Sequence, residues 1–443
     1  MDNNSYDLFR SLAANSSVDE KAVLLELLKE TSVTTTYRNT AILGLKYSIA
    51  YFLASLVFCL ESLILVTRPG TWKKPDFTSL FASSSEKNTS NNHFANLVNA
   101  TDRNLNVLIL ESPLKRYRRK ISDLPNLRIF WCRTPATELS ALSRYFRCFA
   151  SLLRTTIAVS RSRDIGTKLA LMCFVRLIRG NSISTFLKSA LVPKLIFTLS
   201  GNACTSMIEQ ETKGLIQTIH WLHGVGLGFT FESFSEHTLV NNEYDYHYYK
   251  SGIAGEPLFF PDSDLTFSTP RNKRDIRTVV IYSNLIHATN YFFDDYGINV
   301  EEELLDIVSS RFRDTRLVIR PHPASMKLLG NRAEDYAALV QSFGFELYSG
   351  SENLAPEESL YISTVSTSFI DLIACGKCVF MYEKFANTNS RFQDQVSSQI
   401  KFEDGASFDN ALALIDSPDG LTSALNSLTV QSQEAVFEFL LMK

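Results

Sequence analysis

Apolar residues recur at helical spacing near the start of the chain and then give way to short, continuous apolar runs. Residues 18–31 place valine and leucine three and four positions apart, which predicts an amphipathic helix. Residues 106–112 and 127–132 are short apolar runs; the first is followed by Pro113 and the second by a proline-containing turn. Similar runs occupy residues 195–201 and 216–224. Continuous apolar runs of this length are typical of strands in a parallel sheet that is covered on both faces.

The alternation of strands and helices restarts after a polar, proline-containing stretch at residues 268–278, which we interpret as an interdomain linker. The pattern beyond it predicts a strand at 278–284, a helix at 300–312, a strand at 315–323, a helix at 333–344 and a strand–helix–strand unit over 359–383. We therefore expect an α/β protein with two Rossmann-like doubly wound units. Ligands of such units bind at the carboxyl ends of the strands, in the cleft between the units.

This pattern divides the chain into four regions. Residues 1–100 are expected to form an N-terminal helical region, residues 101–267 a first Rossmann-like domain with basic helices, residues 275–420 a second Rossmann-like domain, and residues 421–443 a C-terminal helix. Within the first region, residues 47–60 form an uncharged apolar run of 14. Because a membrane span needs about 20 apolar residues and Glu61 follows at once, we favour a helix that is buried or lies against a bilayer.

Composition and charge narrow the class of protein. The chain has 443 residues, of which 45% are hydrophobic and 21% charged, so a disordered or fibrous protein is excluded. The net charge of −3 argues against a dedicated nucleic-acid binder, and seven cysteines in this length do not indicate a disulfide scaffold. The first residues are polar and acidic and lack the pattern of a cleavable signal peptide, so we expect a cytoplasmic protein.

Basic residues are concentrated in one stretch. Residues 103–194 contain 18 Lys and Arg but only 4 Asp and Glu, a net charge of +14 in a protein of net charge −3. This imbalance indicates a face for an anionic partner, which could be a membrane surface, a lipid-linked phosphate or a nucleic acid. The alternative is a helical surface whose arginines extend their charged ends to solvent and pair internally. The sequence leaves both interpretations open.

Three motifs follow predicted strands. Residues 320–323 read Arg-Pro-His-Pro, and two prolines would hold His322 at a strand end as a preorganised donor to a phosphate. Residues 363–368 read Ser-Thr-Val-Ser-Thr-Ser before a helix, where capping needs only one of the five hydroxyls. Residues 220–228 contain two histidines and three glycines, and His223 is a candidate general base, whereas His220 is expected to pack inside. Each motif also has a plain structural interpretation as a turn or a cap.

Weaker signals accompany these motifs. Asp262 and Asp264 form a D-x-D pair that could ligate Mg²⁺, although one such match arises easily by chance. Cys375 and Cys378 form a lone C-x-x-C, which does not make a zinc site without a second pair. Carboxylates available for base duty are Glu232, Glu236 and Asp245. The fingerprints of P-loop and dinucleotide sites are missing from the sequence.

The order of these motifs over residues 195–383 resembles GT-B glycosyltransferases of the bacterial capsule and surface-polysaccharide type. It is similar to the HP and serine motifs of Kdo transferases and sialyltransferases, and to the motifs of teichoic-acid glycerophosphotransferases. Two departures are Val225-Gly226 after the HG pair and the lack of the acidic sialyltransferase motif. They leave the base open between His223 and a carboxylate.

The resemblance implies an inverting glycosyltransferase that needs no resident cofactor or obligatory metal, although Mg²⁺ could assist. It implies that Arg320, His322, Ser366, Thr367 and Ser368 bind the nucleotide of the donor, with CMP favoured, and that His223 faces the reacting centre. The expected partners are a nucleotide sugar, a glycan or lipid-linked acceptor and the inner-membrane surface, and no nucleic acid. Alternatives are a CDP-glycerol or CDP-ribitol phosphotransferase and a non-catalytic GT-B-like assembly protein. The expected location is cytoplasmic and peripheral to the inner membrane.

Overall fold

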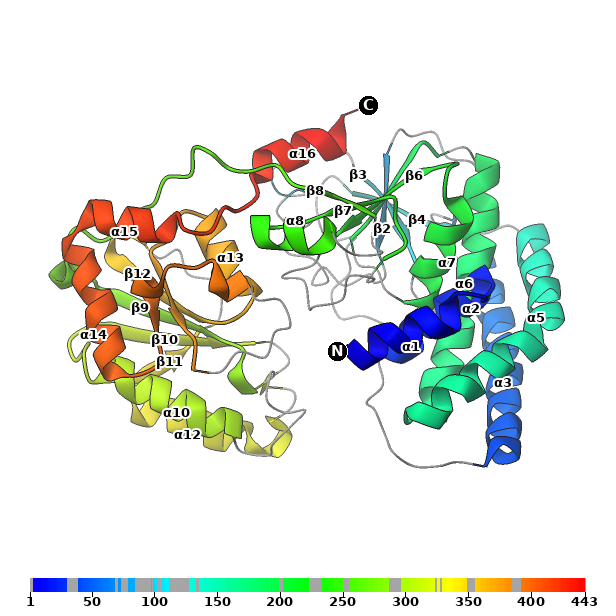
Figure 1. The fold of residues 1–443 in the computed structure, drawn as a ribbon, viewed down its shortest axis with the longest axis horizontal. Helices are drawn as coiled ribbons and strands as arrows, with labels where there is room; N and C mark the ends of the chain where they lie inside the picture. Colours follow the sequence, from blue (N-terminus) through cyan, green and yellow to red (C-terminus); the bar gives the residue numbers. More distant parts are fainter. Residues whose placement is uncertain are drawn as a thin grey trace.

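The computed structural model has two lobes, each built around a parallel sheet (Figure 1). The residues described are 3–29, 39–67, 71–72, 79–83, 97, 99, 101, 105–110, 127–132, 135–190, 192–198, 202–222, 233–250, 255–286, 296–322, 325–326, 329–348, 355–384 and 392–442.

The sheet of the first lobe has eight strands in the order β1-β4-β3-β2-β5-β6-β7-β8, and all neighbouring pairs are parallel. The strands are β1 (Thr71–Trp72), β2 (Ser79–Ser83), β3 (Leu105–Ile109), β4 (Leu127–Cys132), β5 (Lys194–Phe197), β6 (Gln217–Trp221), β7 (His237–Leu239) and β8 (Glu256–Leu258). The chain moves outward in one direction from β2 to β4 and in the other from β5 to β8, which is the doubly wound arrangement.

The sheet of the second lobe has six parallel strands in the order β11-β10-β9-β12-β13-β14. The strands are β9 (Thr278–Ser283), β10 (Arg316–Pro321), β11 (Phe345–Leu347), β12 (Ser359–Thr364), β13 (Val379–Tyr382) and β14 (Lys401–Phe402). Counted from β9, this order is 3-2-1-4-5-6, the arrangement of dinucleotide-binding Rossmann domains. The predicted α/β class with two Rossmann-like doubly wound units is confirmed.

Helices cover both sheets. In the first lobe they are α1 (Asn3–Ala13), α2 (Val18–Lys29), α3 (Thr40–Thr67), α5 (Pro135–Ser162), α6 (Thr167–Ala190), α7 (Ala203–Thr212) and α8 (Glu243–Lys250). In the second lobe they are η2 (Lys273–Asp275), α10 (Tyr296–Ser309), η3 (Gly330–Arg332), α12 (Ala333–Ser342), η4 (Pro356–Glu358), α13 (Thr367–Ala374), η5 (Phe392–Asp394), η6 (Ser398–Ile400), α14 (Gly405–Ala413), η7 (Leu414–Asp416) and α15 (Pro418–Leu425). The last helix, α16 (Gln433–Leu441), follows α15.

The predicted region boundaries differ from the sheets at both ends of the chain. β1 and β2 fall inside the region 1–100 that was expected to be helical, yet both strands belong to the first sheet, and β2 is central in it. The predicted C-terminal helix is two helices, α15 and α16. Val436 and Leu440 of α16 pack into the core of the first lobe, so the end of the chain returns to the lobe in which it began.

Two connections join the lobes. One is the segment after β8, and the other is the segment before α16, and the two segments are hydrogen-bonded to each other and to the end of β7. Ser432 donates its backbone N–H to Phe260, and Gln431 donates to Asn241. The predicted linker at 268–278 overlaps the first connection, and it also contains η2 and the start of β9.

α3 is a continuous 28-residue helix that packs on α5 and α6. The Tyr47 hydroxyl lies 2.6 Å from that of Ser160 on α5, and the Glu61 carboxylate binds the Arg179 guanidinium of α6 at 2.6 Å. Within the described part of the chain, one helix, Thr40–Leu65, is long and apolar enough to cross a membrane, and 33% of its most apolar window is buried in protein.

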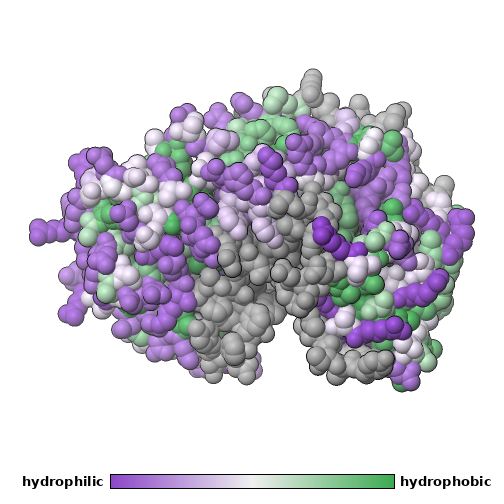
Figure 2. All heavy atoms as spheres, viewed as in Figure 1, coloured by the Kyte–Doolittle hydropathy of each residue, from purple (hydrophilic) through white to green (hydrophobic). Residues whose placement is uncertain are grey.

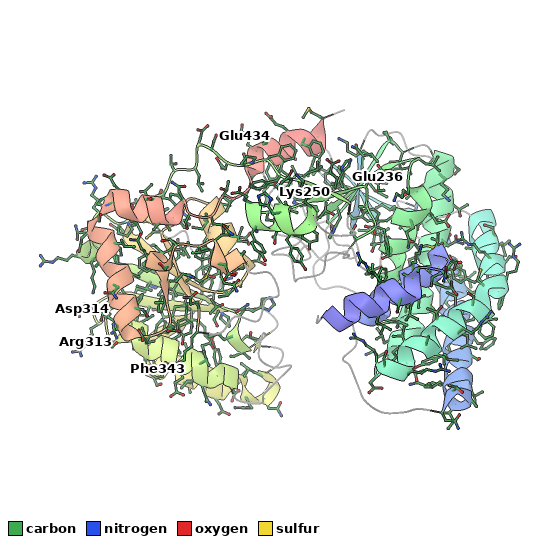
Figure 3. The ribbon with its side chains drawn as sticks, in the orientation of Figure 1. Glu236, Lys250, Arg313, Asp314, Phe343 and Glu434 are labelled. Atoms are coloured by element: carbon green, nitrogen blue, oxygen red, sulfur yellow. The ribbon has the colours of Figure 1, made fainter. Side chains whose placement is uncertain are left out.

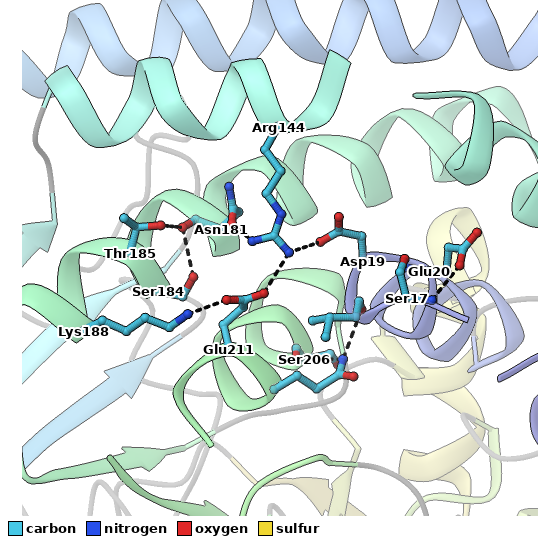
Figure 4. A network of polar contacts seen from close by, with 12 residues as sticks. Ser17, Asp19, Glu20, Arg144, Asn181, Ser184, Thr185, Lys188, Ser206 and Glu211 are labelled. Carbon is cyan, nitrogen blue, oxygen red and sulfur yellow. Dashed lines mark hydrogen bonds and ion pairs between the residues drawn. The ribbon is translucent and has the colours of Figure 1, made fainter. Parts of the chain in front are cut away.

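Several basic residues of α5 and α6 find carboxylate partners from outside their own segment. Arg144 binds Asp19 of α2 at 3.0 Å and Glu211 of α7 at 2.8 Å, which ties three helices together (Figure 4). The other pairs are Arg176 with Glu26, Arg179 with Glu61, and Lys188 with Glu211. For these four residues the interpretation as internal pairing is correct, and the basic segment is less available to an outside partner than its net charge indicates.

Candidate functional site

The centre of the second sheet is the place where the direction of winding reverses. β9 pairs with β10 on one side and with β12 on the other, so the residues after these three strands meet at one edge. The register sets Tyr282 of β9 beside both Arg320 and Ser363. Doubly wound sheets bind their ligands at this edge because two adjacent loops separate here and leave a crevice. Two of the three predicted motifs lie at this edge.

The serine-rich motif forms the junction between β12 and α13. Ser363 and Thr364 are fully buried in the strand, whereas Ser366, Thr367 and Ser368 are half-buried at the start of the helix. Ser366 occupies the N-cap position in extended conformation, but its side chain makes no capping hydrogen bond. Its hydroxyl lies 3.4 Å from that of Ser363 instead. The plain capping interpretation therefore does not account for Ser366, and the helix start presents hydroxyls beside its partial positive charge.

An amide–hydroxyl clamp fixes this junction to the neighbouring strand. The Thr364 hydroxyl lies 2.6 Å from the side-chain oxygen of Asn284, and the backbone N–H of Asn284 donates to the same hydroxyl at 3.1 Å. The Asn284 side-chain amide donates to the carbonyl of Val365 at 3.3 Å. These contacts join the ends of β9 and β12, so the start of α13 is held in position before any ligand arrives.

At the other end of the helix, a glycine forms the turn. Gly376 follows α13 with φ +64°, and a Cβ at this position would lie 2.2 Å from the carbonyl oxygen of Thr266. Lys377 donates its backbone N–H to Leu372, and Gly376 donates to Ile373, which satisfies the last carbonyls of the helix. Glycine is required here both by the backbone conformation and by the close approach of Thr266 in the segment after β8.

Arg320 is exposed at the end of β10, and two tyrosine rings orient its guanidinium. The guanidinium carbon lies 5.3 Å from the ring centre of Tyr282 and 6.0 Å from that of Tyr348. Stacking of this kind restricts the long side chain while leaving its N–H donors free at the edges. A planar cation with free donors suits a phosphate, which accepts two parallel hydrogen bonds.

His322 follows β10, and its backbone is fixed on both sides. Its N–H donates to the carbonyl of Ser283 at 2.7 Å, and its carbonyl accepts from Ser325 at 2.8 Å. The imidazole is exposed. The strand order separates His322 from the start of α13 by β9 alone, a distance of about 10 Å at the usual strand spacing. A diphosphate or a nucleoside phosphate can reach both positions at once.

A buried acid lies behind this edge. Glu301 of α10 is 1% exposed, and burial raises the pKa of its carboxyl to about 7, an effect that the nearby hydroxyls of Ser283 and Tyr336 only partly offset. Ser283 is also the residue whose carbonyl holds His322. A carboxyl that carries a proton near neutrality therefore lies directly beneath the backbone of the candidate site.

Replacing Glu301 by glutamine is expected to remove a pH dependence of stability. Between about pH 4.5 and 7 the unfolded chain loses this proton while the folded protein keeps it, so ionisation at higher pH favours unfolding. Above pH 8, Glu301→Gln should be more stable than wild type by about 3 kcal/mol, with little difference at pH 4. Urea unfolding across this range measures the effect, and Glu302→Gln, an exposed neighbour, is the control. Equal pH slopes for both variants would contradict the assignment.

Fewer of the candidate site residues in the first lobe lie within the described part of the chain. His223, the predicted general base, lies outside the described residues, as does Glu232. His220 is 3% exposed in β6, which confirms that it packs inside. A small pocket is lined by Trp221 at the end of β6, by Asn241 after β7, and by Ile370 and Ala374 of α13, together with residues of α16 and the segment before it. The carboxyl ends of these first-lobe strands therefore face the helix that follows β12.

The other carboxylates named from the sequence lie elsewhere. Glu236 immediately precedes β7, which places it at the amino edge of the sheet, where its side chain accepts from the backbone of Gly214. Asp245 is fully buried and binds the Asn242 side chain at 2.8 Å. Neither position suits a base that must reach a ligand at the carboxyl edge. Asp262 is engaged in a local turn, accepting the backbone N–H of Asp264 at 3.2 Å.

Metal ligands are not gathered in the part of the chain that the structure describes, where no three His, Cys, Asp or Glu side chains form a group that could hold an ion. Burial raises the pKa of the Cys378 thiol to about 12 and also raises that of Cys375, so both remain protonated near neutrality. Protonated thiols are poor nucleophiles and poor metal ligands, so the two cysteines are not suited to thiolate chemistry.

Four residues of this edge were not singled out from the sequence: Tyr282, Asn284, Tyr348 and Glu301. Tyr282 and Asn284 end a strand that was predicted, and the rule that ligands meet the carboxyl ends of central strands could have found them. Tyr348 and Glu301 carry no such signal, since their place beside Arg320 and Ser283 arises only from the packing of β11 and α10.

Comparisons with known proteins find similar solved structures but no relative by sequence. No family model matches the chain, and no curated protein matches it by sequence. One similar solved structure is a variant of the wall teichoic acid polymerase TagF, with a TM-score of 0.42 and 9% identity over 91% of this chain and 93% of that one. Another is UDP-GlcNAc 2-epimerase from Neisseria meningitidis bound to UDP-GlcNAc, with a TM-score of 0.43 and 10% identity over 82% of this chain and 100% of that one. A third is a mutant of S. aureus TarM in complex with Fondaparinux, alpha-GlcNAc-glycerol and UDP, with a TM-score of 0.36 and 12% identity over 63% of this chain and 59% of that one, and this chain therefore spans about three fifths of the length of TarM. The function of this chain has to be inferred from the geometry of its own site.

Proposed function

We propose that this protein is a glycosyltransferase that moves a sugar from a nucleotide-sugar donor to an acceptor hydroxyl. The observation that carries the proposal is the edge of the second sheet, where an uncapped helix start, three hydroxyls and a stacked arginine converge at the point of winding reversal. This set of groups is suited to the phosphates of a nucleotide, because it combines backbone donors, a helix dipole and a planar cation.

Each residue has a distinct role in donor binding. Ser366, Thr367 and Ser368 donate hydroxyls beside the amino end of α13, where the helix dipole favours a negative ligand. Arg320 forms two hydrogen bonds with one phosphate, and His322 adds a donor from the neighbouring strand end. These groups are aimed at the oxygen that becomes negative as the sugar leaves, so they stabilise the transition state more than the ground state.

In the reaction, the acceptor oxygen forms a bond to the anomeric carbon while the bond from that carbon to the phosphate oxygen breaks. The electron pair stays with the phosphate, where Arg320 and His322 meet it without requiring a metal ion, and the acceptor proton passes to a base. We assign this base to His223 in the first lobe. Attack from the face opposite the leaving group inverts the configuration. CMP is the favoured nucleotide and a surface glycan or lipid-linked sugar the favoured acceptor.

A nucleotide panel tests the proposal directly. CMP, CDP, UDP and GDP are added in turn at millimolar concentration, and the midpoint of thermal unfolding is recorded. A nucleotide present at 100 times its Kd stabilises the folded protein by about 2.7 kcal/mol, which raises the midpoint by about 3 °C in a chain of 443 residues. Analysis of the product with the matching donor then separates a glycosidic bond from the phosphodiester of a glycerophosphotransferase. No shift with any nucleotide would exclude the proposed donor site and leave the non-catalytic alternative.

Two serines at helix N-caps provide a matched test of the hydroxyl cluster. Ser366→Ala should weaken nucleotide binding about 10-fold with little loss of stability, because its side chain makes no capping bond. Ser432→Ala, at the start of α16, removes a real cap and should cost about 1 kcal/mol without changing nucleotide affinity. Calorimetric titration and urea unfolding measure the two effects. The assignment fails if Ser366→Ala behaves as Ser432→Ala does.

A further inference from the structure

A stripe of apolar side chains runs along the outer face of α3. We call it the α3 stripe, and it consists of Ile42, Leu45, Ile49, Phe52, Leu53, Leu56, Cys59, Leu60 and Leu63. Its members other than Cys59 are 41–67% exposed, and every exposed residue from position 41 to position 63 is apolar. A continuous exposed apolar stripe of about six turns marks a surface that is covered by something in the cell.

The stripe cannot turn inward, because the opposite face of α3 is fully engaged. Tyr47 and Tyr51 are at most 3% exposed, and Tyr51 contacts the rings of Phe149 and Phe174 on α5 and α6. The paired carboxylate of Glu61 fixes the far end of the helix on Arg179. Rotating the helix to bury the stripe would expose these residues and separate a buried ion pair.

A row of arginines lies on the neighbouring helix. Arg147, Arg154 and Arg161 are exposed on α5 at intervals of seven residues, so they share one face. Within the described residues, none of the three has a carboxylate partner, in contrast to Arg144, which binds two. We call this set the α5 arginine row. α5 has no Asp or Glu after residue 138, so the positive charge of the row is not compensated on its own helix.

The stripe and the row belong to one side of the molecule. α3 and α5 contact each other and both pack on α6, at the end of the first lobe remote from the second lobe (Figure 1). Phe146 is 58% exposed on α5 and its ring contacts Tyr51 of α3, so apolar surface continues from one helix to the other. Apolar and strongly hydrophilic side chains lie side by side over this end of the molecule in Figure 2.

We propose that this surface binds an anionic lipid bilayer, with α3 lying in the plane of the membrane. The α3 stripe enters the boundary between headgroups and acyl chains, and the α5 arginine row meets the negative headgroups. The complementarity of charge identifies the occupant, since an apolar stripe beside uncompensated arginines is the pattern of an interfacial helix. The proposal does not depend on the reaction proposed above.

The residues around the stripe favour in-plane binding to a bilayer over two alternatives, which are a membrane-spanning helix and a second copy of the chain. If α3 crossed the membrane, α5 would accompany it, and its arginines would be distributed over about 21 Å of a hydrocarbon layer about 30 Å thick. If a second copy covered the stripe, like-charged rows would approach each other. On one side the stripe is flanked by Ser48, Ser55 and Ser62. In a coiled coil these flanking positions usually carry charges that pair with the partner helix, so their serines do not favour a second copy.

Flotation with vesicles tests the surface. The full chain is mixed with vesicles of phosphatidylcholine alone or with 30 mol% phosphatidylglycerol, and the floated fraction is measured at 0.1 M and 0.5 M NaCl. We expect binding at least 10-fold stronger to the anionic vesicles at low salt, decreasing as salt rises. Changing Arg147, Arg154 and Arg161 together to glutamine should abolish this preference. The control changes Arg271, Arg274 and Arg313, which are exposed, and should leave binding unchanged. Arg313 is labelled on the second lobe in Figure 3.

A second pair of variants separates the apolar contribution. Ile49, Phe52 and Leu56 changed together to glutamate should abolish binding to both kinds of vesicle, whereas Leu215→Glu, at a site 68% exposed elsewhere on the first lobe, should not. Equal binding of the arginine-row variant and its control would overturn the proposal. A second result would also overturn it: wild type is a dimer by sedimentation, the stripe variant is a monomer, and wild type does not bind vesicles. A second copy of the chain would then cover the stripe. Resistance of the bound protein to extraction at pH 11 would overturn the in-plane orientation in favour of a span.

Discussion

Replacing Arg320 by glutamine is expected to lower kcat/KM for the nucleotide-sugar donor by about 100-fold. Among the described residues of the candidate site, Arg320 alone combines a full charge, exposure and a fixed orientation, since two tyrosine rings hold its guanidinium. Charged hydrogen bonds to a phosphate contribute about 1.5–3 kcal/mol, and the charge that develops on the leaving phosphate places the loss in the transition state. Initial rates over a range of donor concentrations measure the effect.

The same strand supplies a matched control. Arg316 lies four residues earlier in β10, at the amino end of the strand, where its guanidinium binds Glu346 at 2.7 Å on the surface. Arg316→Gln removes an identical charge from the same strand and should change kcat/KM by less than twofold. Arg320→Lys retains the charge but not the planar fork, and we expect only partial recovery. Equal rates for Arg316→Gln and Arg320→Gln would show that the carboxyl edge of this sheet is not the donor site.

The candidate site could be predicted from the sequence to the extent that strand ends could be recognised. The apolar run before Arg320 and the one before Ser366 both end in polar residues, and parallel strands bring such ends to one edge. What the sequence could not supply is the detail that distinguishes a ligand site from a cap. Ser366 occupies the N-cap position, but its side chain makes no capping hydrogen bond and lies near the Ser363 hydroxyl instead. The local sequence pattern does not determine the distance between these two hydroxyls.

The basic segment shows a different limit of sequence reasoning. A net charge of +14 over residues 103–194 is a property of composition, and it includes Arg144, Arg176 and Arg179 as well as the α5 arginine row. Which arginines are free depends on carboxylates that arrive from α2, α3 and α7, and Glu61 is 118 positions away from its partner. The pairing follows from tertiary packing alone, so the two interpretations could be separated only with coordinates.

The first strands could not be recognised from the sequence for a related reason. β1 and β2 have two and five residues and lie among polar positions, too short for a periodic signal. β2 nevertheless takes a central place because β3 and β5 supply hydrogen-bonding partners on both sides. Pairing with neighbours that are distant in sequence contributes most to strand formation, and local propensity contributes little.

Replacing Glu61 by alanine is expected to destabilise the first lobe by about 3–5 kcal/mol. The carboxylate is 3% exposed and accepts hydrogen bonds from Nε and Nη2 of Arg179 at 2.6–3.2 Å, while Arg179 also donates to the carbonyl of Leu110. Removing one partner of a buried pair leaves the other charge without compensation, which accounts for the size of the effect. Urea unfolding followed by tryptophan fluorescence measures the loss.

Two further variants show whether the loss of stability in Glu61→Ala arises from the unpaired charge of Arg179. Glu346→Ala breaks the exposed pair with Arg316 and should cost less than about 1 kcal/mol, because water compensates the remaining arginine. Glu61→Leu combined with Arg179→Met removes both charges at similar volume and should recover most of the stability lost by Glu61→Ala. If the double variant were as unstable as the single one, packing of α3 on α6 rather than charge would be the cause. The apolar α3 stripe would then be held in its outward orientation by shape alone, and Glu61 would have no part in fixing it.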